Sequence, residues 1–169
     1  MHRVHAQVIR QMEVEGEEEG STKVERGVWN GIMRLVPKVF ECLSFCNLRL
    51  GRRQLEVLMN SLGKVGTLRF QSCLVDMENL QIRPTRNPEI TKISFYYCYY
   101  DKIDDEIIPM NLKEFFICVS ASSLGYSLRN LYFKECGYLK KDVQNLANKY
   151  LEDHIAINVS SKIICAKKR

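Results

Sequence analysis

The side chains of this chain with the most obvious chemistry are seven cysteines and three histidines. Cys42 and Cys46 have a spacing that could favour a metal ion, but four residues of strand span about 13 Å, too far for one tetrahedral ion. Cys118 and His154 are a conceivable nucleophile and base, yet nothing near either residue in the sequence activates a thiol. The acidic run 104–106 is typical of a solvated face. We therefore predict no catalytic residues, no metal site and no cofactor.

Three of the cysteines occupy the same place in a recurring pattern. Each is the ninth residue of a segment with apolar residues at its first, fourth, sixth and eleventh positions. The segments are Val65–Val75, Ile90–Tyr100 and Leu128–Tyr138. In a strand, the fourth and sixth side chains share one face, and the ninth turns inward where the strand ends. The recurrence indicates a repeat architecture, in which each unit buries its apolar face by stacking on its neighbours.

The pattern resembles the leucine-rich repeat, L-x-x-L-x-L-x-x-(N/C)-x-L, and its cysteine-bearing form is most similar to the ribonuclease-inhibitor-like and cysteine-containing subclasses. The resemblance implies an α/β fold, a short solenoid with parallel strands on a concave face and helices and loops on a convex face. Three weaker copies begin at Phe40 with Leu48 ninth, begin at Leu112 with Ser120 ninth, and run through Ile155 and Ile157 with Ser160 ninth. The alternative is a set of unrelated strands in an α+β domain.

The copies are unevenly spaced. Phe40 to Val65 and Val65 to Ile90 are each 25 residues, but Ile90 to Leu112 is 22 and Leu112 to Leu128 only 16. The last interval predicts a direct loop in place of a helix. Helical spacing predicts return helices over 51–62, ending at Gly63, and from Asp142 as N-cap to residue 151. Residues 101–110 are expected to form another return segment.

The ends of the chain differ from the repeats in composition. A capping-box sequence at 22–25 and an apolar face ending at Pro37 predict an N-terminal capping helix within 21–39. Trp29 on this helix is expected in the core, the alternative being a binding hot spot. Residues 1–20 carry an acidic run and are expected to be flexible, residues 40–160 form the repeat domain, and 161–169 form a basic tail.

Bulk properties narrow the setting. The 169 residues fit one domain, and we expect no membrane span and no signal peptide. An odd number of cysteines on strand positions predicts reduced thiols in an intracellular compartment: the cytoplasm, with the mitochondrial matrix or the nucleus as alternatives. The first 12 residues lack acids and carry two arginines, a faint similarity to a mitochondrial presequence. The first 20 residues have a net charge of −3 and the remainder +8, a balance compatible with an acidic partner or nucleic acid.

The resemblance implies that partners bind on the concave face, where the second, third, fifth, seventh and eighth positions point outward. Tyrosine and arginine are typical anchors of protein interfaces. The expected partner-binding residues are Arg69, Tyr96, Tyr97, Tyr99, Phe116, Arg129, Tyr132 and Lys134. We predict a non-catalytic protein–protein interaction module, a structural or adaptor subunit of a larger assembly. The alternatives are RNA binding through the same aromatic and basic surface, and aromatics that merely fit β-strands.

Overall fold

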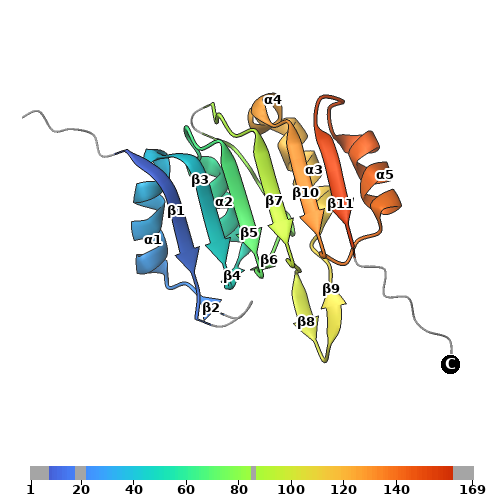
Figure 1. Cartoon of the computed structure of the whole chain (residues 1–169), viewed down its shortest axis with the longest axis horizontal. Helices are drawn as coiled ribbons and strands as arrows, with labels where there is room; N and C mark the ends of the chain where they lie inside the picture. The colour runs from blue at the N-terminus through green and yellow to red at the C-terminus, as the bar shows by residue number, and fades with distance from the viewer. Residues whose placement is uncertain (1–7, 18–21, 85–86, 162–169) are drawn as a thin grey trace, which may run out of the picture.

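The computed structural model describes residues 8–17, 22–84 and 87–161. Six parallel strands form one sheet in the order β1-β3-β5-β7-β10-β11, as Figure 1 shows. Their bounds are β1 Ile9–Glu15, β3 Val39–Cys46, β5 Thr67–Gln71, β7 Lys92–Tyr96, β10 Asn130–Lys134 and β11 Ala156–Ser160. The chain is therefore an α/β protein with a central parallel sheet that does not close into a barrel.

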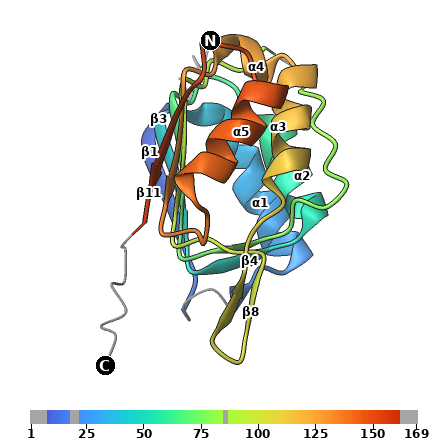
Figure 2. The same ribbon diagram turned by 90° about the vertical axis from the view of Figure 1, so that its right-hand side faces the viewer.

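The helices lie on one face of this sheet, and among the described residues no helix covers the other face (Figure 2). The helices are α1 Arg26–Leu35, α2 Arg52–Ser61, α3 Leu112–Ala121, α4 Leu124–Ser127 and α5 Lys140–Tyr150, with a 3₁₀ turn at Val36–Lys38. The uncovered face is called the open face below. No helix in the described part of the chain has the length and apolar character needed to cross a bilayer.

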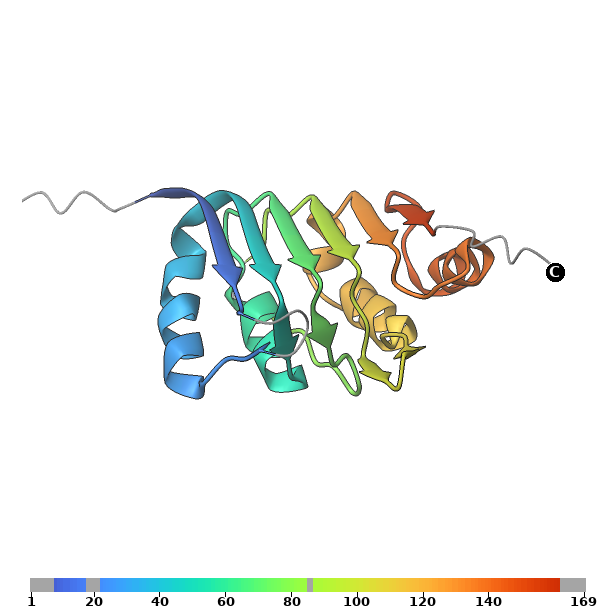
Figure 3. The same cartoon turned by 60° about the horizontal axis from the view of Figure 1, so that its bottom comes forward.

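Two small sheets complete the fold. The short strands β2 Thr22–Lys23, β4 Leu48–Leu50 and β6 Leu74–Val75 pair in parallel just beyond the ends of the main strands, as Figure 3 shows for β4 and β6. An antiparallel hairpin, β8 Asp101–Ile103 and β9 Glu106–Ile108, projects from the molecule below β7 and β10 (Figure 1). Asn47 separates β3 from β4, and Ser72 and Cys73 separate β5 from β6.

In the four central strands the sixth position of the recurring pattern is a phenylalanine, and these residues pair in register as Phe45, Phe70, Phe95 and Phe133. Their ring centroids are 5.7, 5.0 and 5.4 Å apart along the row, and all four rings are buried. Trp29 closes one end of the row, 5.6 Å from Phe45. Stacked rings of this kind combine large apolar burial with favourable ring geometry. This row is the centre of the core, and Trp29 belongs to it.

The eighth position of the recurring pattern, directly after each of these four strands ends, has a left-handed backbone. The φ angles are 57° at Asn47, 51° at Ser72, 53° at Tyr97 and 53° at Glu135. Each of these residues donates its backbone N–H to the neighbouring strand, with distances between 2.9 and 3.0 Å. These bonds offset the strain of a left-handed residue other than glycine. The turn then directs the ninth residue into the core.

The ninth-position cysteines have a structural reason. Cys73 donates its thiol to the carbonyl of Phe45, and Cys136 donates to the carbonyl of Phe95, both at 3.3 Å. The thiol thus satisfies a carbonyl of the preceding strand while remaining small and apolar enough for the core. Burial raises the pKa of Cys136 to about 11 and raises that of Cys98 well above its usual value, so both stay protonated at neutral pH.

The predicted repeat over 112–127 is wrong. Residues 112–121 form helix α3, which Asn111 caps by accepting the backbone N–H of Glu114. Leu112 and Phe115, which we had placed on a strand, also have helical spacing with Phe116 and Val119, and all four are buried. The direct loop expected before residue 128 is therefore wrong as well, since α3 and α4 fill this connection.

The prediction of a flexible segment over 1–20 is wrong for residues 9–15. These residues form β1, which pairs with β3 and places Met12 opposite Leu43 and Val14 opposite Phe45. Residues 1–7 and 18–20 of the predicted flexible segment, and 162–169 of the predicted basic tail, lie outside the described residues. The signal that we missed is the 1, 4, 6 spacing of Ile9, Met12 and Val14, which the intervening charges obscured.

The remaining predictions concern the helices, the segment 101–110 and the last strand, and the structure shifts their boundaries or changes their type. The helices expected at 21–39, 51–62 and 142–151 are present, but Thr22 belongs to β2 and Asp142 lies in the first turn of α5, so neither is an N-cap. The expected return segment over 101–110 is instead the hairpin of β8 and β9 over 101–108, whose turn residues Asp104 and Asp105 both take positive φ. The last strand is shifted by two residues, since Ile157 pairs with Leu131 at the fourth place.

Candidate functional site

The open face consists of the side chains at the third, fifth and seventh positions of the recurring pattern. Strand alternation points these side chains away from the helices. The central row, in register, is Glu13, Ser44, Arg69, Ser94, Tyr132 and Asn158. The row toward the strand ends is Glu15, Cys46, Gln71, Tyr96, Lys134 and Ser160. Charge and size therefore change from one side of this face to the other.

Three cations and two tyrosines gather on β5, β7 and β10, and we call them the basic-aromatic patch: Arg69, Lys92, Tyr96, Tyr132 and Lys134. The Lys92 ammonium lies 4.3 Å from the centre of the Tyr132 ring, and the Arg69 guanidinium 5.8 Å from that of Tyr96. These are cation–π distances. The ion pairs formed among the described residues involve none of the three cations of the patch.

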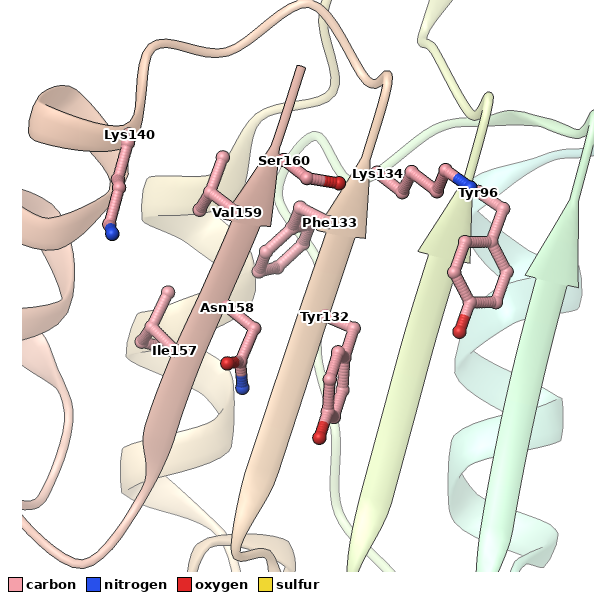
Figure 4. Close-up of a pocket in the computed structure, with 9 residues that line it drawn as sticks. All are labelled: Tyr96, Tyr132, Phe133, Lys134, Lys140, Ile157, Asn158, Val159 and Ser160. Atoms are coloured by element: carbon pink, nitrogen blue, oxygen red, sulfur yellow. The ribbon is translucent and has the colours of Figure 1, made fainter. Parts of the chain in front are cut away.

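A hollow of about 330 Å³ lies on the side of the patch that is nearer to β11. Figure 4 shows its lining, with Tyr96, Tyr132 and Asn158 on adjacent strands and Lys140 on α5. The remaining lining residues are Phe133, Lys134, Ile157, Val159 and Ser160. β11 is the edge strand of the sheet on this side, and its Ile157 and Val159 are only half-buried.

A second hollow, of about 480 Å³, lies on the side of the patch that is nearer to β1. Short side chains such as Ser44 and Thr67 leave this space open. Arg69 and Lys92 line it from one direction and Glu13 from the other. Exposed Glu13 and Glu15 on β1 give this side of the open face a negative edge, called the acidic edge below. Glu41, which also lines the hollow, is paired with Arg10.

Two buried polar atoms at the centre of the face have no hydrogen-bond partner in the described part of the chain. They are Arg69 Nε and Ser94 Oγ. Arg69 and Ser94 are register partners on β5 and β7. Ser94 is fully buried although it belongs to the open face. Buried polar groups are normally paired, so two unpaired donors side by side need an explanation.

Nucleophilic chemistry has little support on this face. Burial, and after it the charge of Glu13, raises the pKa of Cys46 to about 11, so its thiol is protonated at neutral pH. Cys118 and His154 do not meet as a pair: the Cys118 thiol donates to the carbonyl of Leu80, and His154 bonds the carbonyl of Gly125. Among residues 8–17, 22–84 and 87–161, no three His, Cys, Asp or Glu side chains form a group that could hold a metal ion.

The structure gathers half of the residues that we expected to bind a partner. Arg69, Tyr96, Tyr132 and Lys134 all belong to the basic-aromatic patch. Phe116 was wrongly placed on the concave face, because it lies in α3 and is fully buried in the core.

The other three expected residues lie at the margins of the open face. Arg129 precedes β10 and donates to the carbonyls of Tyr126 and Leu128 at the end of α4. Tyr97 is the left-handed residue after β7, and Tyr99 lies beyond that turn, bridged to Leu74 of β6. We did not single out Lys92, Ser94 or Glu13, although their odd-numbered strand positions point them outward.

Comparison of the chain with protein-family models, with curated protein sequences and with solved structures found no match.

Proposed function

We propose that this chain is a short leucine-rich-repeat solenoid that acts as a non-catalytic protein–protein interaction module. In this proposal it is a structural or adaptor subunit of a larger assembly, and it binds its partner on the open face. The repeat interpretation is supported by three features: the 25-residue spacing of the copies that begin at Phe40, Val65 and Ile90, the left-handed eighth residue of four copies, and the inward ninth cysteine of three. The six free thiols of the described residues support the expectation of a reducing intracellular compartment.

The observation that carries the binding proposal is the basic-aromatic patch on a sheet face that no described helix covers. Most strands of parallel sheets are buried on both faces, so an uncovered face calls for a covering partner. Tyrosine and arginine provide large contact area and oriented donors, as in protein interfaces. Arg69, Lys92 and Lys134, which form no ion pair among the described residues, supply charge for a partner of opposite sign.

The second candidate, RNA binding, has one favourable observation: Lys92 lies over Tyr132, a combination that suits both bases and phosphates. The acidic edge weighs against it. A nucleic acid strand that crossed the whole face would bring phosphates onto Glu13 and Glu15, and like charges repel. We therefore favour a polypeptide partner.

Site-specific photo-crosslinking in the cells of origin tests the proposal. A photoreactive phenylalanine analogue at Tyr132 is expected to give a discrete adduct that protease removes and nuclease leaves intact. The same analogue at Gln144, exposed on α5, is the control and is expected to give none. A nuclease-sensitive adduct at Tyr132 would replace the protein partner by RNA. Equal adducts at both positions, or none at Tyr132, would contradict binding on the open face.

A further inference from the structure

The unpaired donors of Arg69 and Ser94 lie at the centre of the open face. Their residues stand opposite each other on β5 and β7, whose strands are about 4.8 Å apart, as in any sheet. Arg69 Nε–H is a donor only, and a serine hydroxyl can donate as well. Neither atom has a partner among the described residues. Two unpaired donors on register partners, one of them positively charged, constitute half of an anion site.

We propose that Arg69 and Ser94 form the anchor subsite for a carboxylate side chain, carried by an acidic polypeptide segment that lies across the open face. This inference rests on the proposed function and names the chemistry of the partner. One carboxylate oxygen accepts from Ser94 Oγ–H and the other from the Arg69 guanidinium, which presents Nε–H and Nη–H in a fixed fork. Lys92 and Lys134 flank the anchor and attract further carboxylates.

Binding a carboxylate requires Arg69 to give up its contact with the Tyr96 ring, and its conformation is compatible with this exchange. In the unbound chain its guanidinium is 5.8 Å from the Tyr96 ring, near the outer limit of a cation–π contact, and no carboxylate in the described part of the chain pairs with it. Both atoms of the anchor are buried, so the arginine side chain must turn on its own torsion angles to admit an anion. This turn exchanges a weak cation–π contact for a charge-assisted hydrogen bond, which is the stronger interaction.

The acidic edge determines which anion fits. A single carboxylate over β5 and β7 is at least two strands, or about 10 Å, from Glu13, which is more than the Debye length of about 8 Å at physiological salt. A polyanion that continued over β3 and β1 would meet Glu13 and Glu15 directly. A polypeptide can follow its acidic residues with neutral or basic ones at that edge, whereas a phosphodiester strand cannot.

Ser44 provides an internal control for Ser94. Both serines lie on the central row, on either side of Arg69, and both are buried. The hydroxyl of Ser44, unlike that of Ser94, has a neighbour to bond, because it lies 3.7 Å from the Cys42 sulfur. Replacement of either serine by alanine removes one oxygen and leaves the packing of the strand unchanged. Only the loss at Ser94 is expected to weaken anion binding.

The test is an NMR titration of the full-length, ¹⁵N-labelled chain, since the Nε–H of arginine gives its own signal. The probes are hexaglutamate, hexalysine and decauridylate. Hexaglutamate is expected to shift the Arg69 Nε–H signal in a saturable manner, and Ser94→Ala to weaken this binding about tenfold. Arg69→Lys lacks this signal, so its binding is followed by the backbone amide signals of Ser94 and Tyr96, and it is also expected to be about tenfold weaker. Ser44→Ala is expected to bind as the parent does. Unchanged amide signals outside the patch establish that each variant is folded.

The outcomes separate the anchor from the wider proposal. If hexaglutamate binds the open face but Ser94→Ala and Ser44→Ala bind it equally, the anchor is overturned while binding on that face stands. If hexalysine shifts the patch more than hexaglutamate, the charge of the partner is overturned. If decauridylate binds more tightly than hexaglutamate, RNA replaces the acidic segment. If no probe moves the Arg69 signal, the carboxylate subsite is overturned, and the crosslinking experiment at Tyr132 judges the proposed function separately.

Discussion

The two faces of the sheet are built from alternate residues of the same strands, and they differ in how much their residues vary from strand to strand. On the helix side, the fourth and sixth positions repeat almost without change, and the row from Phe45 to Phe133 is buried and stacked. On the open side, the fifth position changes at every strand, from Glu13 through Arg69 to Tyr132. Packing tolerates few shapes in a close-packed interior, whereas a solvent-facing row is free to vary. The uniform face therefore supplies stability, and we infer that the varied face supplies recognition.

The largest test of this contrast removes one ring from the uniform face. Phe95→Ala is expected to lower the free energy of unfolding by about 3–5 kcal/mol, because the ring packs on Phe70, Phe133 and Phe115 and leaves a cavity. Urea unfolding followed by circular dichroism measures it. The matched control is Phe40→Ala, at a ring that is 43% exposed, with an expected loss under about 1 kcal/mol. Similar losses for the two variants would erase the distinction between the faces.

Alkaline pH probes the cysteines of the uniform face. Burial holds the pKa of Cys136 at about 11, against 9.0 for an ordinary thiol. Between these values the unfolded chain has released a proton that the native chain keeps, so stability falls as pH rises from about 9 to about 11. Cys136→Ala is expected to make this fall shallower by about 2–3 kcal/mol. Urea unfolding of parent and variant across this range measures the difference, and parallel curves would mean that the thiol is not held protonated.

The acidic edge depends on the pairing of β1 with β3, and Gly16 at the end of β1 permits the two chains to approach closely there. A Cβ on Gly16 would lie 2.3 Å from the carbonyl oxygen of Asn47, so Gly16→Ala is expected to force the strand end apart and lower stability by about 2 kcal/mol. Gly31→Ala in α1 meets no atom within 4 Å and is expected to raise stability by about 0.5–1 kcal/mol. Thermal unfolding of both variants measures the pair. A harmless Gly16→Ala would show that β1 accommodates a side chain at its end.

The smallest expected change in stability lies on the varied face. Tyr132→Ala loses a cation–π contact with Lys92 and is expected to lower the free energy of unfolding by under about 1 kcal/mol. Its effect on partner binding is expected to be far larger than its effect on stability. Urea unfolding and titration with hexaglutamate give the two numbers. A variant that loses stability but retains binding would reverse the roles assigned to the faces.

The spacing of apolar residues in the sequence predicted the four central strands and their register. The segments at 40–50, 65–75, 90–100 and 128–138 pair in the predicted alignment, with Leu43, Leu68, Ile93 and Leu131 in one row. It failed over 112–121, where Leu112 and Phe115 fit a strand and a helix equally well. It also failed at β1, where alternating glutamates concealed Met12 and Val14. In both places the decision depended on what lay opposite in space.

The candidate site was half predictable for the same reason. Arg69, Tyr96, Tyr132 and Lys134 are at strand positions that any two-residue alternation points outward. Their convergence with Lys92 and Ser94, and the unpaired donors of Arg69 and Ser94, depend on cross-strand register. Local sequence determined which way each side chain points, because alternation is a property of the extended backbone. Only the tertiary structure decided that β7 and β10 are direct neighbours, because residues 112–121, which the strand spacing placed between them, form the helix α3 and pack in the core.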